Sequence, residues 1–279
     1  MTYRKGFTLV ELMVVLVVLV ALAGVAMLST ESVVEQARYD ASVKTLDTLE
    51  EGIIGPDGLR QPDGTLIISG FVADMGRLPN GPGPMELLIG TSLKPSALQS
   101  ADLDSDVKLF CGWRGPYVRP PTMSNVFTDS WGKDIEFRNS TDVEALASQG
   151  IVTLFSSNNG GTPLERILNK PERMKGVLLI NITAPQTTDP NKKHVITRIY
   201  GVKNGENKLI NQFEMDSDSD QQDTYSELMT IGPIAVRVYR YSSEPLQTDN
   251  LSATTNLTKS RIVYRTMIPS GTDVSLTIE

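Results

Sequence analysis

The sequence contains one cysteine, Cys111, and one histidine, His194. A disulfide within the chain needs two cysteines, and a zinc site built only from Cys and His needs several such ligands, so the composition excludes both. It also excludes the paired histidines of a metalloprotease helix. We expect Cys111 to be a buried thiol, with an intermolecular disulfide as the alternative in an oxidising compartment.

The sequence also lacks an excess of positive charge. It has 26 lysine and arginine residues against 33 aspartate and glutamate residues, a net charge of −7, which disfavours binding to nucleic acid. His194 has no Gly-x-Ser-x-Gly motif, reactive-cysteine context or phosphate-binding glycine loop beside it. We therefore expect neither a nucleic-acid partner nor an enzyme.

Nearly all of the unbroken apolar sequence lies near the N-terminus. A short basic leader, residues 1–6, contains Arg4 and Lys5 and precedes 22 mostly apolar positions, residues 7–28. A helix of that length covers roughly 30 Å, the thickness of a bilayer core. Because basic residues stay on the cytoplasmic side, the sequence predicts a membrane-spanning segment with the bulk of the chain exported.

Glu11 is unusual because it lies inside this apolar segment. A carboxylate in hydrocarbon costs several kcal/mol unless it is protonated or paired, so Glu11 needs a partner. Once the leader is removed, the free α-amine of Phe7 in a neighbouring copy is a cation at the correct depth. This interpretation joins cleavage and polymerisation in one mechanism.

The string RKGFTLVEL, residues 4–12, with the long apolar segment after it, resembles the class III signal of type IV pilins and type II secretion pseudopilins. The resemblance implies that a prepilin peptidase cuts between Gly6 and Phe7 and methylates Phe7, and that Glu11 neutralises the N-terminus of the adjacent subunit. The implied partners are other pseudopilin subunits and the assembly platform of the inner membrane. The implied location is the bacterial inner membrane, crossed once, with the bulk in the periplasm.

Two other interpretations of the N-terminus stay open. Ala21-Leu22-Ala23 before Gly24 has the form of a secretory signal-peptide cleavage site, but Glu11 would then oppose insertion without benefit. A plain membrane anchor leaves the string around Glu11 unexplained. For the whole protein, the alternatives to a pseudopilin are a minor type IV pilin of a surface pilus and a non-polymerising, membrane-anchored periplasmic binding protein.

Helical periodicity continues beyond the apolar segment through residues 29–55, which we expect to form the exported half of a continuous helix. Gly52, Gly55 and Pro56 are expected to end it. The following stretch, residues 56–163, is rich in turns. Short elements are expected there: a strand at 66–68, a helical turn at 85–89 and a helix at 96–103.

Three strings in this stretch resemble the head of the major pseudopilin of type II secretion: GWRGPYV at 112–118, FTDSWGKDIEF at 127–137 and IVTLFSSNNGG at 151–161. Ser130 replaces the proline of that family. The residues alone predict a tight turn at Trp131-Gly132 and antiparallel pairing of 135–137 with 151–155. The aromatic residues of these strings are expected to pack in the core: Trp113, Tyr117 and Trp131.

Residues 164–279 match no family that we can name, and we expect a β-rich C-terminal extension. Its predicted strands are rich in Val, Ile and Tyr and lie at 177–182, 195–202, 231–241 and 261–268. The expected fold class is α+β: a long N-terminal helix, membrane-spanning in its first half, packed on an antiparallel β head, with this β-rich region added.

Calcium is the cofactor to consider. The resemblance places a calcium loop at residues 156–159, but Ser156, Ser157, Asn158 and Asn159 offer neutral oxygens where the family has aspartates, so a hairpin turn is favoured. A second candidate has carboxylates at four positions of an EF-hand loop: Asp216, Asp218, Asp220 and Glu227. Gln221 occupies the position that needs glycine, and a solvated acidic turn is the alternative.

Overall fold

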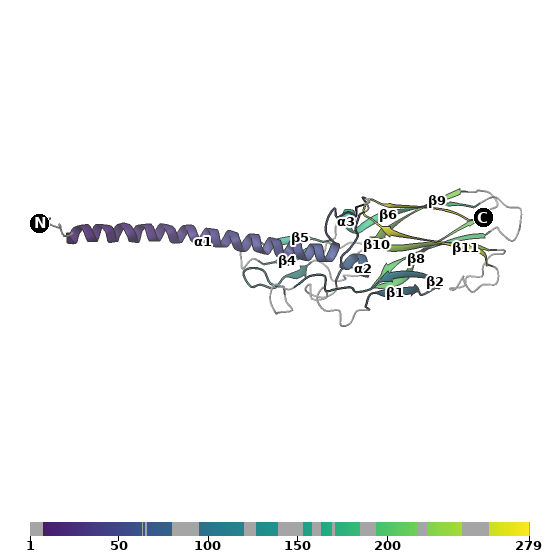
Figure 1. Cartoon of the computed structure of the whole chain (residues 1–279), viewed down its shortest axis with the longest axis horizontal. Coiled ribbons are helices and arrows are strands. Elements are labelled where there is room, and N and C mark those ends of the chain that lie inside the picture. The colour runs from purple at the N-terminus through teal and green to yellow at the C-terminus, as the bar shows by residue number, and fades with distance from the viewer. Residues whose placement is uncertain are drawn as a thin grey trace.

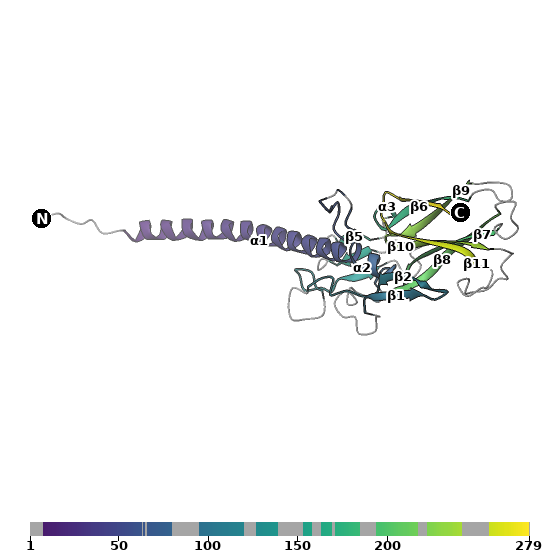
Figure 2. The same cartoon turned by 45° about the vertical axis from the view of Figure 1, so that its right-hand side comes forward.

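A computed structural model shows one long helix that projects from a β-rich head, with the N-terminus at the far end of the helix (Figures 1 and 2). The structure describes residues 8–62, 64, 66–79, 95–119, 127–138, 153–157, 163–168, 171–184, 194–216, 222–241 and 257–278. The expected order of an N-terminal helix followed by β structure is confirmed.

Helix α1 spans Leu9–Ile54 without a break. It ends at Gly55, whose φ of 96° is costly for a residue with a Cβ, and a Cβ there would lie 2.3 Å from the carbonyl oxygen of Ser69. The apolar side chains of the last turns are fully buried: Leu46, Leu49 and Ile53. Val33 is 66% exposed, so the head covers only the C-terminal part of the predicted apolar stripe.

The first core surrounds the C-terminal turns of α1. It includes the short helix α2 (Phe71–Met75) and a small antiparallel sheet in the order β3-β4-β5 (Glu136–Arg138, Thr153–Ser156 and Leu164–Ile167). The predicted pairing of 135–137 with 151–155 is confirmed by β3 and β4. Leu164 and Ile231 belong to this core, so packing crosses the predicted domain boundary at residue 163.

The C-terminal region is a sandwich of two sheets. The three-stranded sheet has the order β12-β6-β9 (Thr272–Thr277, Lys175–Thr183 and Gln222–Thr230). The four-stranded sheet has the order β11-β10-β7-β8 (Leu257–Met267, Gly232–Tyr241, His194–Lys203 and Glu206–Asp216). All pairs are antiparallel except β12 with β6, and a second core lies between the sheets.

The hairpin of β1 (Ala97–Ala101) and β2 (Asp104–Cys111) packs on the other face of the four-stranded sheet. That sheet is therefore covered on both faces, which explains why β10 is buried at nearly every position, Arg237 and Arg240 included. Figure 2 shows the hairpin below β8 and β11. The short helix α3 (Pro171–Met174) leads directly into β6.

Four predicted strands are confirmed as β6, β7, β10 and β11. The helix predicted at 96–103 is wrong: its Ala and Leu residues favour a helix, but the ladder with β2 makes the segment strand β1. The strand predicted at 66–68 is reduced to a single bridge between Leu66 and Arg60. The turn predicted at 85–89 lies outside the described residues.

Candidate functional site

The candidate site is the N-terminal end of α1. Gly6 and Phe7 lie outside the described residues, and Thr8 is the N-cap. The Glu11 carboxylate accepts hydrogen bonds from the Thr8 backbone N–H at 2.8 Å and from the Thr8 hydroxyl at 2.9 Å. The Glu11 N–H donates to the Thr8 hydroxyl at 3.3 Å, which completes a capping box.

This geometry gives Glu11 a role within its own chain that the sequence analysis missed. The pattern Thr-x-x-Glu before an apolar run is the signal that would have revealed it. Both hydrogen bonds end on the Oε2 atom of Glu11. A carboxylate has about four lone-pair sites, so Glu11 can cap its helix and still accept a cation from a neighbour.

The apolar side chains of the first turns of α1 are exposed in the single chain. From Leu9 to Leu22 their exposed fractions range from 50% to 82%. Isolated exposed apolar residues are ordinary, but a contiguous apolar surface of this size indicates an interaction with apolar surroundings. In the part of the chain that the structure describes, no helix combines the length and the hydropathy needed to cross a membrane.

Two strings of the head hold α1 in place. A Cβ at Gly52 would lie 2.3 Å from Val118, so only glycine lets the helix approach the Gly-Pro-Tyr segment this closely. On the same helix, the Ser42 hydroxyl accepts from the Ser130 N–H at 2.9 Å, and Glu35 accepts from the Trp131 indole at 3.0 Å. The predicted tight turn at Trp131-Gly132 is confirmed.

Tyr117 lies in a polar cluster at this junction. Its hydroxyl accepts from the Arg114 N–H at 2.9 Å and donates to Asp74 at 3.0 Å, and the Arg114 guanidinium also donates to Asp74. Burial raises the pKa of Asp74, whereas Arg114 and the Tyr117 hydrogen bond lower it. Burial also raises the pKa of Tyr117, so its hydroxyl stays protonated as a donor.

We expect Tyr117→Phe to destabilise the head by about 1–3 kcal/mol at neutral pH, because the buried Asp74 carboxylate loses one of its hydrogen-bond donors and the Arg114 N–H loses its acceptor. The Tyr117 hydrogen bond lowers the pKa of Asp74. Its contribution is therefore present above that pKa and lost as the pH falls through it. Chemical denaturation at several pH values tests this. A loss of stability that is the same above and below the pKa of Asp74 would contradict the prediction.

In the first calcium candidate, residues 156–159, the Ser156 side chain takes part in a structural hydrogen bond. Ser156 donates its hydroxyl to Asp129 at 2.5 Å, and Asp129 also accepts from the N–H groups of Trp131 and Lys133. Asp129 therefore organises the turn before β3. Asn158 and Asn159 lie outside the described residues, and Ser157 follows β4.

The second calcium candidate is divided between two strands. Asp216 ends β8, Asp218 and Asp220 lie outside the described residues, and Glu227 lies within β9. Glu227 accepts a hydrogen bond from Asn211 at 2.8 Å, five residues before Asp216. Five strand residues span about 16 Å, so the structure does not bring Glu227 to Asp216. Among the residues described, no cluster of three His, Cys, Asp or Glu side chains is placed to hold a metal ion.

Cys111 and His194 are both placed on strands. Cys111 ends β2 and is fully buried, which confirms the predicted buried thiol. His194 begins β7 and pairs with Asp216 of β8. The strand predicted at 195–202 therefore begins one residue earlier than expected, at His194.

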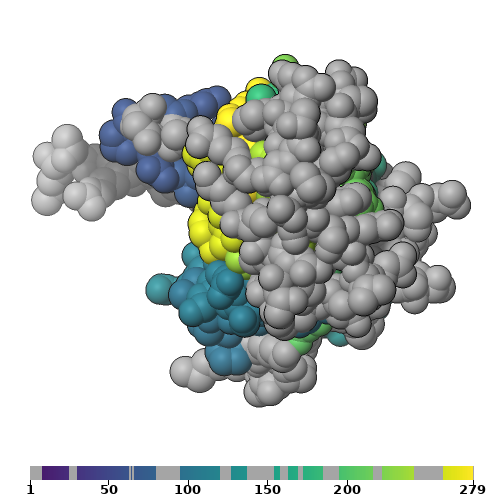
Figure 3. Space-filling view, turned by 90° about the vertical axis from the view of Figure 1, so that its right-hand side faces the viewer, coloured from purple at the N-terminus to yellow at the C-terminus, as the bar shows by residue number. Residues whose placement is uncertain are grey.

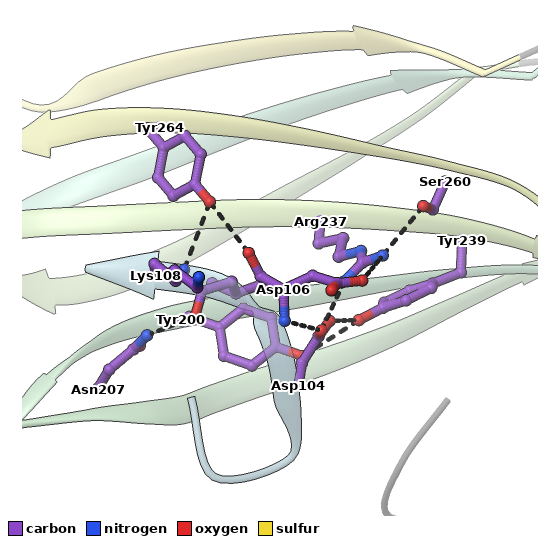
Figure 4. Close-up of polar contacts among 10 residues, drawn as sticks. Asp104, Asp106, Lys108, Tyr200, Asn207, Arg237, Tyr239, Ser260 and Tyr264 are labelled. Atoms are coloured by element: carbon purple, nitrogen blue, oxygen red, sulfur yellow. Dashed lines mark hydrogen bonds and ion pairs between the residues drawn. The ribbon is translucent and has the colours of Figure 1, made fainter. Parts of the chain in front are cut away.

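A buried ionic cluster between β2 and β10 was missed (Figure 4). The Asp104 carboxylate accepts from the Arg237 guanidinium at 2.5 Å and from the Tyr239 hydroxyl. Burial and the hydrogen bond to Asp104 raise the pKa of Tyr239, so this hydroxyl remains a donor. The sequence signal was an arginine within the apolar run of β10, a position that needs a buried counter-ion. Through these contacts, Asp104 of β2 binds the β1-β2 hairpin to β10 of the four-stranded sheet.

Comparison with known proteins supports the N-terminal signal. Residues 1–27 match the family model described as the prokaryotic N-terminal methylation motif. Comparison with curated protein sequences gives no match. A leucine-rich repeat protein of solved structure, from Bacteroides thetaiotaomicron VPI-5482, is 8% identical over 53% of this chain and 22% of its own length. Its TM-score of 0.24 is too low to indicate a shared fold. The chain therefore carries a type IV pilin-like prepilin signal, which marks it as a substrate of a prepilin peptidase and indicates anchoring through its N-terminal helix.

Proposed function

We propose that the protein is a pseudopilin, a structural and non-catalytic subunit of a type II secretion filament. Residues 7–28 lie in the inner membrane before assembly, and the head lies in the periplasm. The observation that carries the proposal is the exposed apolar surface of α1, from Leu9 to Leu22, within the residues that match the methylation motif. In a filament this surface is buried between neighbouring helices, which removes a large apolar area from water or lipid.

The head strings favour the secretion family over a surface pilus. GWRGPYV and FTDSWGKDIEF, which resemble the major pseudopilin head, are the segments that hold α1 through Gly52, Ser42 and Glu35. The resemblance of these two strings to the major pseudopilin head, and their position against α1, both support a pseudopilin-like packing of the head on the helix. A minor type IV pilin is the alternative, because the N-terminal motif is common to both classes.

Intact-mass and N-terminal analysis of the protein from membranes of cells with a prepilin peptidase tests the proposal. We expect an N-terminus at Phe7 that carries one added methyl group. The matched control is a strain without the peptidase, where Met1 to Gly6 should remain. An N-terminus at Gly24 would indicate a secretory signal peptide, and an uncut leader in the peptidase strain would indicate a plain anchor. Either result would overturn the proposal.

A further inference from the structure

The two long sides of the C-terminal sandwich carry opposite charge. On one side, β8 and β9 contain five carboxylates and one lysine: Glu206, Glu214, Asp216, Asp223, Glu227 and Lys208. On the other side, β11 and β12 contain three basic residues and one acidic residue: Lys259, Arg261, Arg265 and Asp273. Each of these four strands is an edge of its sheet. Exposed sheet edges are sites where another chain can dock.

The carboxylates of β9 lie in the seam between β9 and β8, which we call the acidic seam. Asp223 and Glu227 share a strand face with Tyr225, which stacks on Phe213 of β8 at 4.4 Å between ring centroids. Asp223 accepts from the Tyr225 hydroxyl at 2.9 Å, and Glu227 accepts from the Asn211 amide. Both partners are neutral, and within the described ranges no cation pairs with either carboxylate.

The arginines of β11 lie in the opposite seam, between β11 and β12, which we call the basic seam. Arg261 and Arg265 share a strand face with Val263, which packs against the core between the sheets. The Arg261 guanidinium donates to the Thr277 carbonyl of β12 at 3.1 Å. Both arginines are exposed, and neither contacts a carboxylate of the described part of the chain. Figure 3 shows the C-terminal strands (yellow) at the surface, above the β1-β2 hairpin (teal).

The two seams match in spacing as well as in charge. Asp223 and Glu227 are four residues apart, as are Arg261 and Arg265, so each pair is separated by about 13 Å along its strand. A partly buried apolar side chain lies between the charges in both seams, Tyr225 in one and Val263 in the other. The acidic side also has exposed apolar residues, Ile210 at 37% and Leu228 at 60%, which line a cavity of about 100 Å³.

We propose that the basic seam of one copy docks on the acidic seam of a second copy, with the two arginines against the two carboxylates. The contact uses different surfaces on the two partners, so it repeats head to tail instead of closing a dimer. The inference rests on the proposed function, because it names a contact between the heads of neighbouring subunits in a filament. It does not depend on the N-terminal helices for its specificity.

Cysteine crosslinking between two tagged copies in the same membranes tests the contact. One full-length copy carries Ser226→Cys on β9 and the other carries Thr266→Cys on β11, and a bis-maleimide joins them. Cys111 is buried and therefore gives little background. We expect a heterodimeric crosslink that decreases at high salt, because exposed charge pairs are screened.

Charge reversal gives the decisive comparison. R261E with R265E on the Thr266→Cys copy should reduce the crosslink at least fivefold. Adding D223R with E227R to the other copy should restore it. Absence of the crosslink with native charges, or no recovery on double reversal, would overturn the proposal. The N-terminus, measured in the same sample, keeps the two proposals separate: a methylated Phe7 without the crosslink rejects the head contact alone.

Discussion

Glu11→Leu should leave cleavage after Gly6 intact and abolish assembly of the protein into filaments. In the proposed filament, the variant removes the carboxylate that we expect to face the methylated amine of Phe7 in the neighbouring subunit, which would leave that amine in the helix bundle without a counter-ion. A single charge in an apolar environment costs several kcal/mol. Each added subunit would bury one unpaired amine and pay this free-energy cost again, so elongation becomes unfavourable. Reconstituted assembly, followed by sedimentation and electron microscopy, measures the result.

The capping box makes a matched control available. Thr8→Ala removes the hydroxyl that bonds to Glu11 but keeps the carboxylate, and loss of an N-cap costs about 1 kcal/mol. Thr8→Ala should therefore weaken assembly only slightly. If Glu11→Leu polymerises normally, the charge-pair mechanism is wrong. If Thr8→Ala fails as completely as Glu11→Leu, the main role of Glu11 is to cap its own helix.

Glu11→Gln separates charge from hydrogen bonding. The glutamine amide oxygen can accept from the Thr8 N–H and hydroxyl, so the local cap is kept while the negative charge is lost. We expect Glu11→Gln to behave like Glu11→Leu in assembly and like the native protein in cleavage. Native-like assembly of Glu11→Gln would show that hydrogen bonding, and not charge, supports the filament.

Periodicity and turn chemistry predicted the long helix and six of the twelve described strands: β3, β4, β6, β7, β10 and β11. The helix was predictable because apolar residues recur with helical spacing through residues 29–53, and Gly55, with a φ of 96°, ends it. The Asn204-Gly205 turn, with φ of 53° and 72°, lies between β7 and β8. Strand β8 itself was missed because its polar residues, such as Asn207 and Gln212, obscure the strand pattern. These residues instead bond to the hairpin and to Arg198.

The candidate site was predictable only in part, because its proposed chemistry depends on two copies. A motif of nine consecutive residues predicts cleavage and methylation, and a contiguous motif can be recognised from the sequence alone. The proposed head contact was not predictable, because it requires the relative position of four strands. From the sequence, Glu227 was assigned to a calcium loop or a solvated acidic turn, and the strand that contains it and Asp223 was not predicted. Only the pairing of β9 with β6 shows them on one edge of a sheet.

Asp104→Ala should destabilise the head by about 3–5 kcal/mol, because it leaves the Arg237 guanidinium buried without its closest counter-ion. The side chains of Asp104 and Arg237 are 0% and 5% exposed. The variant also removes the acceptor of the buried Tyr239 hydroxyl. Urea denaturation of the full-length protein, followed by tryptophan fluorescence and by circular dichroism of the β sheets, measures the change.

Asp106→Ala is the matched control, because Asp106 contacts the same guanidinium at 3.0 Å but is 61% exposed. An exposed partner contributes at most about 1 kcal/mol, so this variant should stay close to the native stability. The pair Asp104→Leu with Arg237→Met removes both charges together and should cost less than Asp104→Ala alone. Equal losses for Asp104→Ala and Asp106→Ala would show that the cluster stabilises the head by surface charge instead of by a buried ion pair. If the pair is buried, most of the cost of Asp104→Ala comes from the unpaired Arg237 guanidinium that remains. Removing Arg237 as well should then recover part of the lost free energy of unfolding.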